Sequence, residues 1–404
     1  MTEILKTLLS DKNRRRAADI LFYVALTTEL VLMLVEKSEI SFTLESYVFR
    51  VTFLLTLLAV LIMKHDRREW LLICAAFAFT FVCYRISGKN DLMRLAAFIM
   101  AARDIDLKKA MKYTFYVSLV GFIVIALLAV AGILGDVALV ADYGRKVGEE
   151  TRYVFGFGHP NTLLGCVYAM ILMWIWIYGR KASALVYATV IVISAVFAAI
   201  TKSRTGVAVL AATLILAVIV RLFPKLSELK VLYILEMLVT PVLCVVSAVL
   251  AAGFAEGAYV PGAFFKITNL YWEIDWKLSN RLSNLYYGAP DHGGILSSWR
   301  LFAERGTDAY FDLGWVRLFY WYGIIPTAVI AILIIALLYV CMVKKDMQAA
   351  LLILSLSIYT TVEATFVTRY LGRDFFLLIA GAYLGCFFKY ILPGKGETKE
   401  IANG

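Results

Sequence analysis

Side chains able to hold an anion and to accept a proton are concentrated in one polar insert, residues 253–313. His292 is the only histidine of this insert, and imidazole, with a reference pKa of about 6.5, accepts a proton readily at neutral pH. Asp291 precedes it and is a second candidate base. Guanidinium groups suited to bidentate phosphate contacts come from Arg281, Arg300 and Arg305. The insert therefore predicts an anion-binding site with a proton acceptor.

The same insert carries further polar and aromatic groups. Its other carboxylate candidates are Asp275, Glu304, Asp308 and Asp312. Its tyrosines and tryptophans either stack on sugar rings or lie as an aromatic belt in the membrane interface. Both interpretations apply to Tyr271, Trp272, Trp276, Tyr286, Tyr287 and Trp299.

A Gly-Phe-Gly-His-Pro-Asn motif precedes an apolar run that begins at residue 160. Pro160 suits the first turn of a helix, because the N–H that proline lacks would have no partner there. We therefore expect His159 at a helix N-terminus, where the helix dipole favours an anion and disfavours protonation of the imidazole. His159 is a candidate anion ligand, and the alternative is a cap that fixes where the helix begins.

A second motif, Ser203-Arg204-Thr205-Gly206, forms a tight turn between two apolar runs. An arginine held between two helix ends is well placed for bidentate contacts to phosphate. The two hydroxyls beside it add hydrogen-bond donors. Arg204 is thus a second candidate ligand outside the insert, and the alternative is a hairpin tip whose arginine is solvated.

These side chains must be positioned by membrane helices. The chain is 62% hydrophobic and 17% charged, whereas soluble domains are about half apolar and a quarter charged. Long apolar runs recur along its whole length, as in a polytopic membrane protein. We expect one all-α integral membrane domain over residues 1–404, with the insert between the ninth and tenth of about twelve spans: 17–35, 46–63, 69–85, 90–102, 112–134, 160–179, 183–201, 205–222, 230–252, 314–341, 347–366 and 374–392.

Basic residues in the short loops predict the orientation. With the N-terminus inside, every cytoplasmic segment carries at least two lysines or arginines, which places both termini in the cytoplasm and the insert outside. Several arginines and lysines nevertheless fall on the outer side, and an anionic ligand there would explain them. Because the cations are divided in this way, the net charge of +10 does not indicate nucleic acid. The first apolar run lacks a cleavage site and predicts an uncleaved membrane helix.

Charges inside membrane spans normally face the protein interior. The ionisable residues inside the predicted spans include Glu29, Arg94, Glu236 and Glu363. Glu363 is close to the outer end of its span and could point toward the insert, whereas Glu29 and Glu236 are better explained by protonation or pairing across helices. The six cysteines show no metal-type spacing and are interpreted as small buried hydrophobes.

The order of these motifs resembles a known family. The histidine and arginine motifs, a long outer loop beginning near Arg281, and the run Asp312-Leu-Gly-Trp-Val-Arg-Leu leading into Trp321-Tyr-Gly-Ile-Ile are together similar to the superfamily of O-antigen polymerases and O-antigen ligases. By motif the resemblance covers residues 150–330, and by topology the rest.

The resemblance implies a membrane glycosyltransferase with a GT-C-like fold in the bacterial inner membrane. Such an enzyme transfers a glycan from undecaprenyl pyrophosphate to another lipid-linked repeat at the outer leaflet, inverts the anomeric centre, and uses neither a metal nor another cofactor. Arg204 and Arg281 would bind the pyrophosphate with help from Arg300, Arg305 and His159, and His292 or Asp291 would be the base. A flippase and a chain-length regulator are further partners to test.

Three alternatives stay open. A ligase would transfer the glycan to lipid A core, but the Asp-His-Gly-Gly context of His292 is not clearly that of the ligase histidine, which favours the polymerase. A metal-dependent enzyme of the same fold class would place an acidic pair in the first outer loop, whereas Asp104 and Asp106 are predicted cytoplasmic. A transporter or flippase of lipid-linked sugars would show matching interrupted helices in two halves, and no halves are visible.

Overall fold

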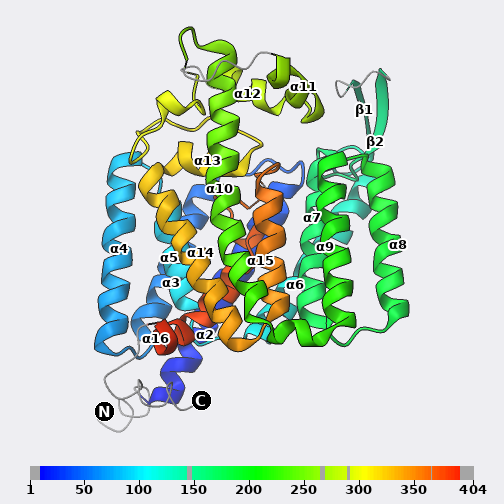
Figure 1. Ribbon diagram of the computed structural model, residues 1–404. Helices are drawn as coiled ribbons and strands as arrows, with labels where there is room; N and C mark the ends of the chain where they lie inside the picture. Colours follow the sequence, from blue (N-terminus) through cyan, green and yellow to red (C-terminus); the bar gives the residue numbers. More distant parts are fainter. Residues whose placement is uncertain (1–9, 143–147, 264–268, 289–291, 365, 392–404) are drawn as a thin grey trace. The chain divides into compact units, whose positions relative to one another are not determined.

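Helices make up nearly all of the regular structure (Figure 1), as the apolar runs predict. The computed structural model describes residues 10–142, 148–263, 269–288, 292–364 and 366–391. Its α-helices are α2 (Asp11–Lys37), α3 (Glu45–Ile62), α4 (Arg67–Ser87), α5 (Asp91–Ala101), α6 (Leu107–Val130), α7 (Pro160–Trp174), α8 (Ala184–Thr201), α9 (Arg204–Leu222), α10 (Lys230–Tyr259), α11 (Asn269–Lys277), α12 (Arg281–Tyr287), α13 (Gly314–Tyr322), α14 (Ile324–Lys344), α15 (Met347–Thr360) and α16 (Phe376–Ile391).

In the part of the chain that the structure describes, four short helical segments and one hairpin complete the regular structure. The segments are the π-helical η1 (Ile175–Gly179) and the 3₁₀ turns η2 (Pro224–Glu228), η3 (Leu296–Ser298) and η4 (Leu371–Arg373). Strands β1 (Ala138–Asp142) and β2 (Glu149–Tyr153) pair antiparallel, with Ala138 opposite Tyr153. This hairpin departs from the all-α prediction, because Val140, Thr151 and Tyr153 favour strands and the segment lies outside the apolar runs.

Within the described residues, nine helices are long and apolar enough to cross a membrane, so the chain is a multi-pass membrane protein. They correspond to nine of the twelve predicted spans: α2, α3, α4, α6, α7 with η1, α8, α9, α10 and α14. The other three predicted spans form α5, α15 and α16, of 11, 14 and 16 residues. At 1.5 Å per residue each is shorter than the hydrocarbon layer of about 30 Å.

Two predicted boundaries were wrong. Helix α10 continues to Tyr259, so the first residues of the predicted insert are helical. The predicted span 314–341 is broken at Gly323, which has φ of 99° and separates α13 from α14. A Cβ at Gly323 would lie 2.6 Å from the Phe302 Cα. The break therefore needs glycine for both its backbone angle and the close approach of the insert.

The chain forms two compact units. The first comprises residues 1–84, 90–121 and 369–404. Its interior holds a buried ion pair, because Arg94 Nη2 lies 2.9 Å from the Glu29 carboxylate. Thr52 donates to the same carboxylate and Arg94 also donates to the Arg369 carbonyl, at 2.6 and 2.7 Å. The interpretation of Glu29 as a residue paired across helices is thus confirmed.

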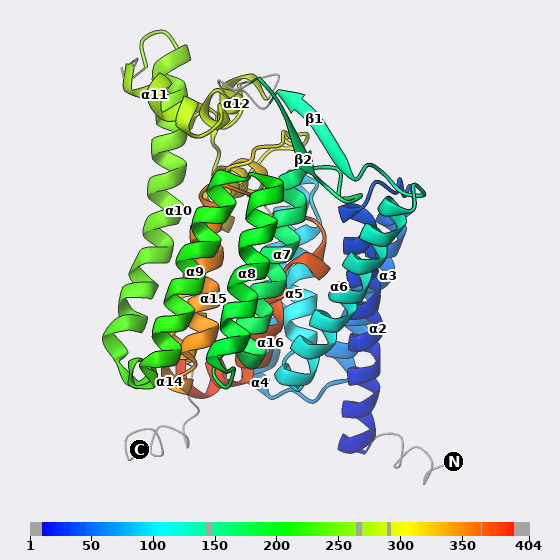
Figure 2. The same ribbon diagram turned by 90° about the vertical axis from the view of Figure 1, so that its right-hand side faces the viewer.

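The second unit comprises residues 85–89 and 122–368 and contains the insert. In it, α10 packs against α14 and α15, and α7 packs against α8 and α9. Figures 1 and 2 show α11, α12, α13 and the hairpin gathered at one end of these long helices. Glu236, on α10, is buried, and its Oε2 has no hydrogen-bond partner among the described residues. The sequence allowed Glu236 to pair across helices, but Glu236 forms no such pair with the described residues of the second unit.

Candidate functional site

Arg281 is the centre of the candidate site. It is the first residue of α12, and its side chain is only 6% exposed. Its Nη2 donates to the Glu363 carboxylate, its Nε lies 3.5 Å from Asp312 Oδ2, and its Nη1 lies 3.5 Å from the Thr205 hydroxyl. The buried Nε has no hydrogen-bond acceptor. The guanidinium therefore keeps donor capacity for a further acceptor.

Asp275 fixes the helix that begins with Arg281. Its carboxylate is 2% exposed and accepts from the backbone N–H groups of Leu282 and Ser283, at 2.7 and 3.1 Å. These are donors that the first turn of a helix leaves without partners. A negative charge there is also favoured by the helix dipole. Asp275, predicted only as a carboxylate candidate, is thus a positioning residue for Arg281.

We expect Asp275→Ala to lower the free energy of unfolding by about 1–2 kcal/mol, as other lost N-terminal caps do. The change should also misplace Arg281 and slow whatever reaction the site performs. Unfolding of the purified protein in detergent, followed by circular dichroism, measures the first effect. Glu273→Ala is the matched control, because Glu273 lies on the same helix, is exposed and, among the described residues, pairs only with Lys277. Equal losses in the two variants would contradict the positioning role.

Glu363 lies just past the end of α15, and α13 is packed against this point. A Cβ at Gly314 would meet the Thr360 Cγ2 at 2.6 Å and the Ala364 Cα at 3.2 Å. The indole of Trp315 donates to the Ser357 carbonyl at 3.2 Å. The Asp-Leu-Gly-Trp run thus brings Asp312 close to Glu363, because glycine lets the two backbones approach and tryptophan fixes them.

Arg317 holds the same two segments together from the other side. Its guanidinium is 2% exposed and donates to the Phe311 carbonyl through Nε and Nη2, at 3.0 and 2.6 Å. Its Nη1 donates to the Val367 carbonyl at 3.1 Å, and the Tyr310 ring lies 3.6 Å from its guanidinium carbon. Arg317 is therefore fully engaged in structure.

The Gly-Phe-Gly-His-Pro-Asn motif joins the site through Asn161. The Asn161 side-chain amide donates to the Glu363 carboxylate at 2.9 Å, so Glu363 receives bonds from both Asn161 and Arg281. His159 is the N-cap of α7, and its Nδ1 accepts from the Asn161 backbone N–H at 3.2 Å. The expected helix start is confirmed. His159 caps this helix, which was the alternative to its predicted role as an anion ligand.

The charged residues of the site also affect the pKa of His159. Burial lowers the pKa of its imidazole below the usual 6.5, Asp312 opposes this change, and Arg152 and Arg281 add to it. Accepting the Asn161 N–H requires an unprotonated Nδ1, which agrees with the direction of the pKa change. His159 is therefore neutral at pH 7, and it lies within electrostatic reach of Arg281 and Asp312.

A pH dependence follows from this lowered pKa. A histidine whose pKa is lower in the folded protein stabilises the fold fully above its unfolded pKa of about 6.5. This stability is lost as the pH falls through the folded value. We expect the melting temperature of the wild type to fall between pH 7.5 and 5.5, and His159→Asn, which keeps a capping acceptor, to show a smaller fall. Identical pH profiles would contradict the lowered pKa.

Arg204, Arg300 and Arg305 are not part of the Arg281 cluster. Arg204 begins α9, is exposed and has no hydrogen bond or ion pair with any described residue. Arg300 is exposed and lies 3.3 Å from Glu304. Arg305 donates to the Arg85 carbonyl at 3.3 Å. Of these three arginines only Arg204 adjoins the cluster, because the next residue, Thr205, contacts Arg281.

His292 lies on an aromatic stack. Its ring is parallel to that of Tyr286 at a centroid distance of 3.8 Å, and Tyr286 stacks in turn on Tyr259 at 4.4 Å. The His292 Nδ1 lies 3.1 Å from the Tyr286 carbonyl. Within the described part of the insert no hydrogen bond, ion pair or ring contact joins His292 to Arg281, and Asp291 lies outside the described residues. The role of base for His292 or Asp291 stays a prediction.

The arrangement can do two things chemically. The underused donors of Arg281 can bind an anionic oxygen, and charge-assisted bonds of this kind are the strong ones. Asp312 is 40% exposed on its side chain and stands beside that guanidinium, so it can accept a proton from a bound hydroxyl group. The described residues contain no group of three or more His, Cys, Asp or Glu side chains that could hold a metal ion.

Sequence reasoning missed the roles of Asn161, Thr205 and Asp275. Asn161 and Thr205 belong to recognised motifs and Asp275 to the insert, but their roles depend on which side of a helix start faces Glu363 or Arg281. Comparison with protein-family models, with curated proteins and with solved structures finds no match to this chain. The functional argument therefore rests on the site itself.

Proposed function

We propose that the chain is a membrane glycosyltransferase that polymerises lipid-linked glycan repeats in the manner of O-antigen polymerases. Its donor would be a glycan on undecaprenyl pyrophosphate, and its acceptor would be a second lipid-linked repeat. In this proposal the fold is GT-C-like with twelve crossings, in which α5, α15 and α16 complete the count as short spans. The protein would lie in the bacterial inner membrane, with both termini in the cytoplasm and the site outside.

The observation that supports this proposal most is the convergence on Arg281. Segments that lie far apart in sequence contribute to one cluster: Thr205 from the start of α9, Asp312 before α13, Glu363 after α15, and Asn161 with His159 at the start of α7. Arg281 is held by Glu363, and its Nε, 3.5 Å from Asp312 Oδ2, makes no hydrogen bond. A buried, preorganised guanidinium is what a leaving pyrophosphate requires when no metal stabilises its charge.

The proposed reaction is a displacement at the anomeric carbon of the donor. The acceptor hydroxyl forms the new glycosidic bond while the bond from the anomeric carbon to the phosphate oxygen breaks. The pyrophosphate leaves with the electron pair, and Arg281 stabilises the charge that develops on its oxygens. Asp312 takes the hydroxyl proton, since it is the half-exposed carboxylate beside Arg281. Attack from the face opposite the leaving group inverts the anomeric centre.

Purified protein tests this proposal directly. Incubated in detergent with a lipid-linked repeat, it should yield ladders of longer lipid-linked glycans without any membrane or nucleotide sugar. A transporter would leave the repeats unchanged, and a ligase would consume them only when lipid A core is added. Asp312→Asn should remove most of the lengthening, and His292→Gln should leave most of it. If instead His292→Gln removes most of the lengthening and Asp312→Asn leaves most of it, His292 is the base.

A further inference from the structure

A groove on the first unit is lined by residues that take no part in the candidate site. It has a cavity volume of about 440 Å³ and is formed by α2 and α6. Its lining residues are Arg16, Asp19, Ile20, Tyr23, Val24, Thr27 and Tyr113. This volume falls within the range of about 300–1,000 Å³ that small-molecule sites occupy.

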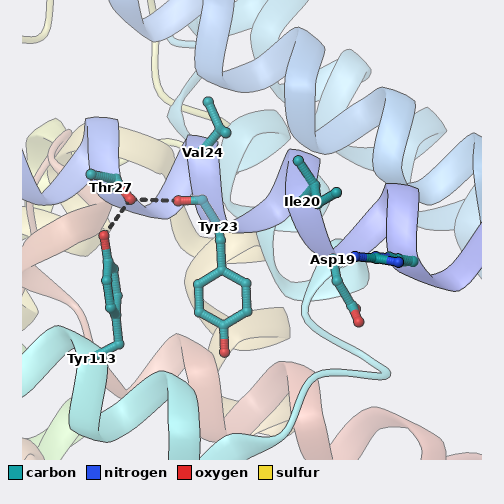
Figure 3. A pocket seen from close by; sticks show the side chains of 7 residues that line it. Asp19, Ile20, Tyr23, Val24, Thr27 and Tyr113 are labelled. Atoms are coloured by element: carbon teal, nitrogen blue, oxygen red, sulfur yellow. Dashed lines mark hydrogen bonds between the residues drawn. The ribbon is translucent and has the colours of Figure 1, made fainter.

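The shape of the groove follows from the way these two helices meet. Tyr113 of α6 and Thr27 of α2 share a hydrogen bond of 2.6 Å, and the rings of Tyr23 and Tyr113 form an edge-to-face pair at 5.7 Å (Figure 3). Farther along, Gly121 of α6 approaches α2 so closely that a Cβ there would overlap the Leu34 side chain. The helices are thus held together on that side, and the groove opens toward their N-terminal ends.

The two walls of the groove differ in chemistry along its length. Ile20 and Val24 belong to a predicted membrane span, yet they are 57% and 48% exposed. They leave an apolar wall of the kind that faces lipid. At the N-terminal end, Arg16 lines the groove. On α6, Lys109 lies one helical turn before Tyr113, and Lys112 directly precedes Tyr113. An apolar trough with cations at one end is complementary to an acyl chain that carries an anionic head group.

Carboxylates at the same end do not cancel this positive charge. Asp19 lines the groove, and Asp104 and Asp106 belong to the loop before α6. Asp104 is held by Arg103 at 2.8 Å, and Asp106 lies 3.6 Å from Lys109. Arg15 and Lys108, which neighbour Arg16 and Lys109 in sequence, are two further exposed cations, so cations outnumber carboxylates in these segments. A hydroxylated head group would also give Asp19 a hydrogen-bond donor.

We propose that this groove binds one anionic phospholipid, with an acyl chain against Ile20, Val24 and Tyr23 and the phosphate at Arg16. Phosphatidylglycerol fits this description, because its phosphate meets the arginine and its glycerol hydroxyls can donate to Asp19. The site is independent of the glycan chemistry proposed above. It would hold a structural lipid at the end of α2 that the sequence predicts to be cytoplasmic.

Native mass spectrometry of the full-length protein in detergent tests the proposal, with phosphatidylglycerol and phosphatidylethanolamine added as separate probes. We expect the tightest phosphatidylglycerol binding to weaken at least about fivefold in Arg16→Gln, the loss that one basic residue near a membrane surface implies. Val24→Trp should weaken it similarly by filling the groove. Wild-type protein should bind phosphatidylglycerol at least about fivefold more tightly than phosphatidylethanolamine.

Two matched controls separate the groove from general attraction. Arg180→Gln removes another exposed, predicted cytoplasmic arginine, and Val31→Trp adds the same bulk at a 49% exposed position of α2 that does not line the groove. Both should bind phosphatidylglycerol within about twofold of the wild type. Equal binding of the two lipids, equal losses in test and control variants, or no loss in either test variant would overturn the proposal. The last outcome would favour a protein helix as the occupant.

Discussion

Arg281→Lys is expected to slow lengthening of lipid-linked repeats by about 100-fold or more, the loss seen when one donor to a developing charge is removed. Lysine keeps the positive charge that Glu363 requires, so the fold should survive. It does not keep the planar fork of donors that lets one side chain hold Glu363 and reach a phosphate oxygen at once. The measurement is the rate of polymer formation by purified protein.

The control for this prediction is Lys277→Gln, which removes an exposed cation from the same insert. Lys277 pairs only with Glu273, at 2.7 Å and with both side chains 63% exposed. The rate of polymer formation by the Lys277→Gln variant should stay within about twofold of the wild type, because exposed ion pairs contribute little to stability. Arg281→Gln combined with Glu363→Gln provides a second inactive variant without an unpaired buried charge. Full activity in either Arg281 variant would show that Arg281 does not stabilise the leaving pyrophosphate.

Arg94→Met is expected to give the largest loss of stability, about 3–5 kcal/mol in the free energy of unfolding. The Glu29 side chain is 0% exposed, and without Arg94 its charge would be buried without a compensating cation. The Arg369 carbonyl would also lose its donor. Unfolding in detergent by titration with a denaturing surfactant measures the effect.

Two comparisons make this second prediction specific. Lys64→Met breaks an ion pair with Asp11 whose side chains are 73% and 69% exposed, and should change stability by less than about 1 kcal/mol. Glu29→Met combined with Arg94→Met removes both charges and should be less destabilised than Arg94→Met alone, since the cost lies in the unpaired charge. A double variant as unstable as the sum of the singles would contradict this explanation.

Helix positions could be predicted well because hydrophobicity alone determines them. Nine predicted spans match helices long enough to cross a membrane, and the prediction failed where a single residue overrides the pattern. Gly323 breaks an apolar run because the insert passes directly over it. The β-hairpin could not be predicted from hydrophobicity, since each strand has only five residues and β2 is mostly polar.

The site was predictable in part. The motifs that place Arg281, His159 and Asp312 at one end of the second unit were visible, because each lies at or just before the start of a helix. The contacts that join them were not, since the rotation of each helix start decides whether Asn161 or a neighbour faces Glu363. His292 stacks on the ring of Tyr286, a contact that its residue type did not indicate, and its role as the base stays a prediction.

The affinity of the purified protein for undecaprenyl pyrophosphate, compared between Arg281→Lys and Lys277→Gln, tests the central claim most directly. A charge-assisted hydrogen bond contributes about 1.5–3 kcal/mol, so Arg281→Lys should bind at least about tenfold more weakly than the wild type. Lys277→Gln should bind as the wild type does. Wild-type affinity in Arg281→Lys would show that the diphosphate is held elsewhere, and the proposed site would be wrong.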